Sequence, residues 1–240
     1  MEKAIIGKKV GMTQIFDEAG KVIPVTVIQA GPCTVVQKKT EEKDGYVAVQ
    51  LGYEEVPERK LSKPELGHSK KAGKALRILK EFKLDNAATL NVGDEITANV
   101  FATGDRVDIT GISKGKGFQG AVKRCNTAIQ KKSHGGGPVH RHSGSMGAAT
   151  DPSRIFKGKN GAGQMGNEQV TVMNLDVIKV DEELGVIAVR GAVPGPKGGV
   201  VALRSIVKKV KIAQVTEAGR VNPQKASARV NPQKASARNK

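Results

Sequence analysis

The sequence predicts a mainly β protein: a β-barrel body with a small α+β insert, a long extended glycine-rich basic loop and a disordered basic C-terminal tail. Three observations lead to this fold class. Strand-like runs are short and numerous, while helical patterns are rare. Residues 113–167 show neither the helical nor the strand periodicity of apolar residues. The positive charge is concentrated in that segment and in the tail. Many short strands separated by turn residues are typical of a barrel.

The body is predicted to consist of strands that pair in antiparallel fashion. β-branched and apolar runs predict strands at residues 4–10, 13–16, 23–30, 34–38, 46–53, 76–84, 95–101, 106–112, 169–174, 175–180, 186–190 and 200–203. Turn residues at 18–20, 31–32, 43–45 and 183–185 separate them, and residues 64–73 favour a short helix. The predicted body spans residues 1–112 and 168–212, with an insert near 54–95. The loop at 113–167 separates its two parts, and the tail at 213–240 follows it.

The charge of the chain is distributed very unevenly. The net charge is +17, but residues 1–108 and 168–206 carry only +1 and −1. Residues 109–167 hold ten basic residues and a single acid, Asp151, and residues 207–240 hold nine basic residues and Glu217. A near-neutral body with two cationic extensions suits a partner that is a polyanion, which neutralises their self-repulsion.

The central segment is predicted to become ordered on that partner. It contains twelve glycines and few apolar residues, so burial cannot offset its conformational entropy, and a structureless stretch of this length in a compact protein is otherwise unusual. We therefore expect it to be mobile in the free protein and held by phosphate contacts in the complex.

Composition argues against several other classes of protein. Two widely spaced cysteines, Cys33 and Cys125, do not suggest a disulfide framework and favour a reducing cytosol. No apolar run resembles a signal peptide or a membrane span, so we expect a cytoplasmic protein without membrane contact. The tail repeats VNPQKASAR twice, and two polar nine-residue units cannot build a core, which favours disorder over an ordered RNA-wrapping extension.

Residues 115–120 match the G-x-G-x-x-G pattern of dinucleotide-binding loops. Their context disagrees, because no acid that could bind a ribose occurs between Asp108 and Asp151. The glycines are better explained as a backbone that phosphates can approach closely.

A zinc site and an enzyme active site are also disfavoured. Cys125, His134, His140 and His142 have none of the usual spacings of structural zinc ligands. No carboxylate stands between residues 109 and 150 to orient a histidine, so we expect no catalysis, no metal, no cofactor and no small-molecule substrate.

Aromatic residues make up only 3% of the chain, which disfavours a sheet that stacks bases on aromatic rings. Phe118 and Phe156 are the aromatic residues of the cationic segment, and base contact and packing against the loop's own backbone remain open for both.

Several ordered motifs closely resemble ribosomal protein three of the bacterial large subunit, the universal L-three family. They are GKKVGMTQIF (7–16), IPVTVI (23–28), TGISKGKGFQGAVKR (110–124), GSMG (144–147), FKGK (156–159), AGQMGNEQVTV (162–172) and RGAVPGPKG (190–198). The resemblance runs from near the N-terminus to about residue 212. The repeated tail does not belong to the family pattern.

This resemblance implies a translation-protein-type barrel on the outside of the large subunit and a loop that reaches through 23S rRNA toward the peptidyl transferase centre, with residues 125–141 nearest to it. It also implies primary binding near the 3′ end of that RNA, nucleation of subunit assembly, and contact with large-subunit proteins fourteen and nineteen. We expect no binding to DNA. Some family members carry a methylated glutamine after GSMG; this chain has Ala148, Ala149 and Thr150 there, so we predict no such modification.

The charge map and the resemblance together predict the rRNA-binding residues. They are Lys8, Lys9, Lys114, Lys116, Lys123, Arg124, Lys131, Lys132, His134, His140, Arg141, His142, Arg154, Lys157, Lys159 and Gln164. Two alternatives to a structural ribosomal protein remain: a transient assembly factor with the same electrostatics, and a nucleotide-dependent transferase that uses the glycine loop.

Overall fold

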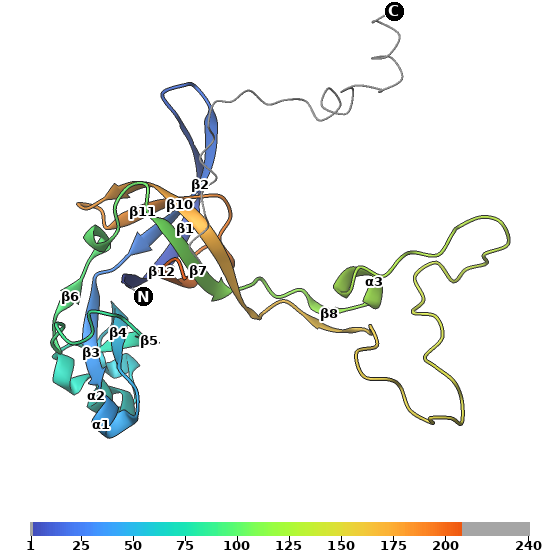
Figure 1. Cartoon of the computed structure of the whole chain (residues 1–240), viewed down its shortest axis with the longest axis horizontal. Helices are drawn as coiled ribbons and strands as arrows, with labels where there is room; N and C mark the ends of the chain where they lie inside the picture. The colour runs from blue at the N-terminus through green and yellow to red at the C-terminus, as the bar shows by residue number, and fades with distance from the viewer. Residues whose placement is uncertain (1, 208–240) are drawn as a thin grey trace, which may run out of the picture. The chain divides into compact units, whose positions relative to one another are not determined.

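A computed structural model describes residues 2–207 of the chain. Its main element is a closed antiparallel barrel with the strand order β1-β12-β7-β10-β11-β2 (Figure 1). These strands span Ala4–Phe16 (β1), Val200–Ser205 (β12), Arg106–Ile112 (β7), Gln169–Asp181 (β10), Val186–Arg190 (β11) and Val22–Ala30 (β2). The predicted mainly β fold with a barrel body is confirmed. The predicted tail and its repeat lie outside the described residues.

The barrel closes around β-branched and aliphatic side chains. Ile5, Ile28, Ile109, Ile187 and Leu203, from five different strands, are completely buried. Such residues pack well on a pleated surface, and closure leaves the barrel strands without free edges where they pair. This closure gives β7 and β10 a rigid base from which the cationic segment departs.

A second sheet packs against the barrel and shares its core. Its order is β5-β4-β3-β6, formed by Leu76–Phe82 (β5), Ala48–Glu55 (β4), Cys33–Lys39 (β3) and Glu95–Ile96 (β6). Cys33, Val35, Val49 and Leu51 belong to the same hydrophobic cluster as the barrel residues. The chain crosses between the sheets at Gly31, whose φ of +72° favours glycine, and where a Cβ would approach Ile96 O to 3.0 Å.

Short helices accompany the second sheet: α1 (Glu41–Asp44), η1 (Glu58–Lys60), α2 (Lys63–Ser69), η2 (Lys70–Ala72) and η3 (Ala98–Val100). The predicted helix at 64–73 corresponds to α2 and η2. Helix α2 begins with a capping box, in which Ser62 N and Oγ donate to Glu65 Oε2 at 2.8 and 2.9 Å. These bonds lower the pKa of the Glu65 carboxyl.

Three expectations about the strands and the loop need correction. The strands expected at 4–10 and 13–16 form the single strand β1, and those at 169–174 and 175–180 form β10; each contains a register shift that interrupts the sequence pattern. The strand expected at 95–101 ends at Ile96 because η3 follows. The second sheet includes β3, which pairs with β4 and β6. Finally, residues 113–167 are not free of regular structure.

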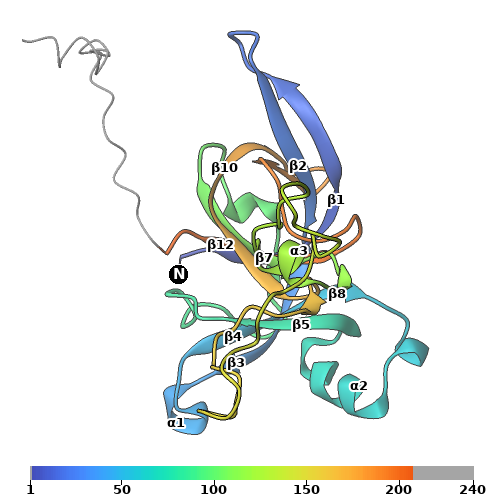
Figure 2. The ribbon, with the colours of Figure 1, turned by 90° about the vertical axis from the view of Figure 1, so that its right-hand side faces the viewer.

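That last segment contains three short elements close to the barrel. They are β8 (Gly117–Gln119), α3 (Ala121–Arg124) and β9 (Gly163–Met165), of which β8 and β9 pair with each other. Beyond α3 the chain forms an open loop without a helix or strand until β9 (Figure 1). Figure 2 shows the same elements from a perpendicular direction. Among the described residues, no helix is long and apolar enough to cross a membrane.

Candidate nucleic-acid interface

The cationic segment leaves the barrel through a hydrogen-bonded neck. We define the neck as residues 113–119 and 163–168, which continue the pairing of β7 with β10. Ser113 N donates to Glu168 O at 2.9 Å, and Lys116 N donates to Met165 O at 2.8 Å. The barrel therefore fixes the position and direction of both ends of the loop.

The neck depends on a glycine at one position. Gly166 has a φ of +74°, and a Cβ there would overlap the carbonyl group of Lys114. A side chain would meet both the conformational cost of this region and a clash with the backbone of the opposite strand. Gly166 thus allows the two strands of the neck to approach each other.

Arg124 connects the two strands of the neck at the end away from the barrel. Its Nη1 donates to Gly161 O at 3.0 Å and its Nε to Gln164 O at 3.3 Å, so one guanidinium connects α3 to the returning strand. Gly163 leaves room for this, since a Cβ there would lie 3.2 Å from Arg124 Cζ. Planar guanidinium groups suit such two-point contacts. Arg124 consequently acts first as a positioning residue of the loop.

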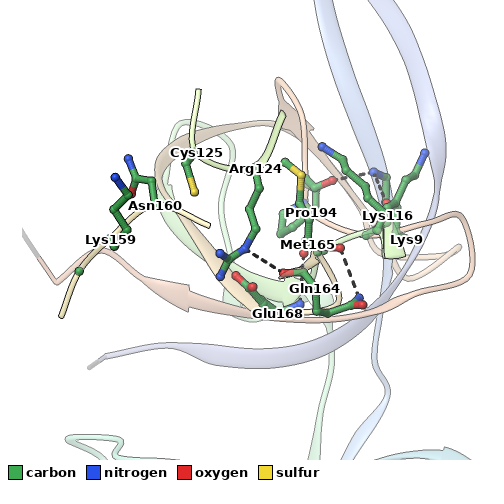
Figure 3. Close-up of a pocket in the computed structure, with 16 residues that line it drawn as sticks. Lys9, Lys116, Arg124, Cys125, Lys159, Asn160, Gln164, Met165, Glu168 and Pro194 are labelled. Carbon is green, nitrogen blue, oxygen red and sulfur yellow. Dashed lines mark hydrogen bonds between the residues drawn. The ribbon is translucent and has the colours of Figure 1, made fainter. Parts of the chain in front are cut away.

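A cleft of about 880 Å³ lies beside the neck, between the loop and the turn that precedes β12 (Figure 3). Lys9, Lys114, Lys116, Arg124 and Lys159 line it together with a single carboxylate, Glu168. The remaining lining includes the polar residues Asn160 and Gln164 and three glycines, Gly158, Gly166 and Gly195. An excess of cations next to accessible backbone favours phosphate groups.

Lys9 differs from the other cations of the cleft. Its side chain is buried, and its Nζ donates to Val193 O at 2.6 Å and to Gly195 O at 3.2 Å. Burial, and then the charge of Lys114, lower its pKa. The predicted phosphate contact of Lys9 is therefore secondary to a structural role, in which it fixes the turn after β11 that forms one wall of the cleft.

Lys8 does not join this group. Its Nζ lies 3.5 Å from Glu54 Oε1 in an ion pair between the barrel and β4, in a different pocket of the surface. The ion pair offsets part of its charge locally, so the structure gives Lys8 weaker support as an RNA ligand than it gives the loop cations.

The other predicted residues lie on the neck, on α3 and along the open loop. Exposed side chains are those of Lys114, Lys116, Lys123, Arg124, Lys131, Lys132, His134, Arg141, His142, Arg154, Lys157, Lys159 and Gln164, and His140 is half-buried. The loop has few contacts that hold its shape. Gln130 N donates to His140 O at 3.1 Å, and Lys159 Nζ donates to Ser145 O at 2.8 Å.

Two details of the loop point to an absent partner. His140 Nδ1 is buried but forms no hydrogen bond, and buried polar atoms are usually paired. Phe118 and Phe156 are 76% and 58% exposed, with the Arg154 guanidinium 5.4 Å from the centre of the Phe156 ring. Neither ring packs inside the chain, which leaves both free to contact bases.

The glycine motif at 115–120 lies within an antiparallel hairpin. It enters β8 and is followed by α3, which has only four residues. The dinucleotide-binding motif instead requires a parallel β-α-β unit whose helix N-terminus holds the pyrophosphate. The geometry does not support the nucleotide-dependent alternative. Within residues 2–207, no group of three or more His, Cys, Asp or Glu side chains is placed to hold a metal ion.

An antiparallel barrel that carries a cationic, glycine-rich loop on a hydrogen-bonded neck has the features of a nucleic-acid-binding protein. The family model described as Ribosomal protein L3 matches residues 77–186, which include β5 from its second residue on, β7, the whole loop and β10. This match supports a member of the ribosomal protein L3 family. The family implies a structural constituent of the large ribosomal subunit in the cytoplasm that binds rRNA.

Proposed function

We propose that the chain is a primary binder of 23S rRNA that nucleates large-subunit assembly near the 3′ end of that RNA. In this proposal the barrel stays on the outside of the subunit beside ribosomal proteins L14 and L19. The loop at 113–167 reaches inward toward the peptidyl transferase centre, with residues 125–141 nearest to it. The chain contributes no chemistry of its own and needs no cofactor.

The single observation that carries the proposal is the neck. A rigid barrel fixes both ends of a loop that is rich in cations and poor in internal contacts. Such a loop gains order only from many simultaneous contacts with a polyanion. A loop of this kind is suited to threading between rRNA helices and holding their phosphates together.

The proposed contacts come from side chains that point away from the protein. We assign phosphate contact to the exposed lysines and arginines of the loop, and base or phosphate contact to His134, His140, His142 and Gln164. Arg124 holds the neck and Lys9 holds one wall of the cleft. Lys8 forms an ion pair between the barrel and β4. In this division the neck sets the path of the loop and the exposed cations supply the affinity.

Sedimentation of a cell lysate through a sucrose gradient after a high-salt wash distinguishes this proposal from a transient assembly factor. One copy per large subunit that resists the wash supports the structural role, while recovery only in free or precursor fractions supports the transient alternative. The timing of assembly is tested separately, by adding the chain to protein-free 23S rRNA. A primary binder associates without other proteins, and dependence on previously bound proteins contradicts nucleation.

The position of the loop tip is tested by function. Replacing Arg141 with Ala should slow peptidyl transfer in reconstituted subunits more than replacing Lys60, an exposed lysine of the body. Equal effects of Arg141→Ala and Lys60→Ala would contradict the placement of the tip near the catalytic centre.

A further inference from the structure

The hairpin formed by β1 and β2 continues beyond the barrel. Strand β12 pairs with β1 at residues 4–8, and β11 pairs with β2 at residues 25–29. The two hairpin strands nevertheless remain paired with each other as far as Phe16 and Val22. Figures 1 and 2 both show this part as a two-stranded ribbon that stands clear of the barrel.

One exposed face of this ribbon is apolar apart from Gln14. Phe16 lies directly opposite Val22, and Gln14 lies opposite Pro24, so these residues share a face with Met12, two positions before Gln14. Met12, Phe16 and Val22 are 53%, 63% and 53% exposed, and Pro24 is exposed as well. We call Met12, Phe16, Val22 and Pro24 the hairpin ridge.

The ribbon lacks the support that two strands usually need. A two-stranded hairpin is only marginally stable in water unless a third strand or another packed element covers its apolar face. Contiguous exposed apolar side chains are typical of surfaces that bind another molecule. Among the described residues, the opposite face is better covered, with Ile15 and Ile23 half-buried and Val25 fully buried.

The charge of the ribbon indicates the kind of partner. Residues 10–24 contain two acids, Asp17 and Glu18, and one cation, Lys21. Phosphate contact depends on lysine and arginine, and this chain concentrates those residues in the loop instead. A second copy of the chain is disfavoured by the repulsion between two molecules that each carry +17.

We propose that the hairpin ridge is the docking surface for an apolar face of another protein of the large subunit. The inference requires only that the chain is a constituent of that subunit. It also deepens the proposed contact with neighbouring subunit proteins, because it assigns that contact to a particular face of β1 and β2. The barrel thus binds a protein through its hairpin while the loop binds RNA.

Photo-crosslinking in purified large subunits tests the proposal. A photoreactive benzoylphenylalanine replaces Phe16 in one variant and Leu184, an exposed residue of the turn between β10 and β11, in a control. We expect Phe16 to crosslink to one subunit protein in stoichiometric amounts, identified by mass spectrometry, and Leu184 to give a different product or none. A crosslink of Phe16 to rRNA or to a second copy of the chain, or no crosslink, would overturn the proposal.

A loss-of-contact variant gives a second measurement. Met12→Ser with Phe16→Ser should weaken binding of the crosslinked protein to the chain by about tenfold or more. Thr13→Ser, on the other face of the same ribbon, should leave that binding unchanged. Because the ridge is exposed, the doubly substituted chain should keep its thermal midpoint and its affinity for 23S rRNA. Unchanged protein binding would refute the docking surface, while loss of rRNA affinity would assign the ridge to RNA.

The partner's identity separates this inference from the proposed neighbours. A crosslink to L14 or L19 supports both. A crosslink to a different subunit protein supports the docking surface and shows that neither L14 nor L19 binds at the hairpin.

Discussion

Replacing Arg124 with Ala should open the neck of the loop without unfolding the barrel. The Arg124 guanidinium forms two hydrogen bonds to Gly161 O and Gln164 O. At an exposed site each contributes on the order of 1 kcal/mol, below the value for buried charged donors. Losing about 2 kcal/mol should increase local opening of the neck by about 30-fold, since 1.4 kcal/mol corresponds to a factor of ten.

Amide hydrogen exchange of the free chain measures this opening directly. The reporters are the amides of Ser113 and Lys116, which bond across the neck, and the control amides are those of the barrel core. Lys123→Ala removes the same charge one residue earlier and should leave exchange of the neck unchanged. Arg124→Lys should protect the neck only partly, because an ammonium lacks the planar fork. If Arg124→Ala and Lys123→Ala exchange alike at Ser113 and Lys116, the positioning role of Arg124 is wrong.

Three further substitutions or reactions test other parts of the structure. Gly166→Ala should destabilise the neck by about 2–3 kcal/mol, because a Cβ there is strained and clashes with the opposite strand. Gly161→Ala should not destabilise it, because Gly161 has open space around it and no positive φ. Hydrogen exchange of the neck amides compares the two variants. Asp108→Ala should lower the unfolding free energy by about 1–3 kcal/mol, measured by urea titration, because it removes the buried carboxylate that accepts a hydrogen bond from the backbone N–H of Asn174. Burial raises the pKa of the Cys33 thiol to about 12, so a thiol reagent at pH 8 should label the half-exposed Cys125 and spare Cys33. Because unfolded Cys33 ionises near pH 9 and folded Cys33 only near 12, this thiol should reduce stability as the pH rises above about 9; a midpoint in urea that stays constant from pH 9 to 11 would contradict this.

The barrel strands could be predicted because their residue types and turns carry a local signal. The prediction at 106–112 and at 186–190 matches β7 and β11. The interruptions inside β1 and β10 look like strand ends in the sequence, because a bulge and a turn both break the alternation of residues. At 95–101 the apolar run continues into η3 and its C-cap, where Ala98 and Phe101 are buried by packing and not by strand pairing.

The neck could not be predicted from local pattern. Strands β8 and β9 have three residues each, are rich in glycine and lie more than 40 residues apart in the sequence, so neither shows a strand period. The same limit applies to Lys9. Charge alone placed it among the phosphate ligands, but only the fold brings the carbonyl groups of Val193 and Gly195 to its ammonium.

The charge map was the most informative part of the sequence. It located the cationic segment without any knowledge of the fold, because an excess of lysine and arginine over acids requires no long-range contact to detect. The structure adds the rigid neck, the cleft and the division between cations that organise the loop and cations that face outward.

The central claim is that the exposed cations of the loop hold rRNA through its phosphates, and salt dependence tests it most directly. Binding of the free chain to a fragment of 23S rRNA should be measured over a range of salt concentrations. If about half of the ten loop cations contact phosphate, the logarithm of the affinity should fall against the logarithm of salt concentration with a slope on the order of −4 to −5. Replacing Lys131, Lys132 and Arg141 together with Ala should make this slope less steep, and an affinity that does not change with salt would contradict the account.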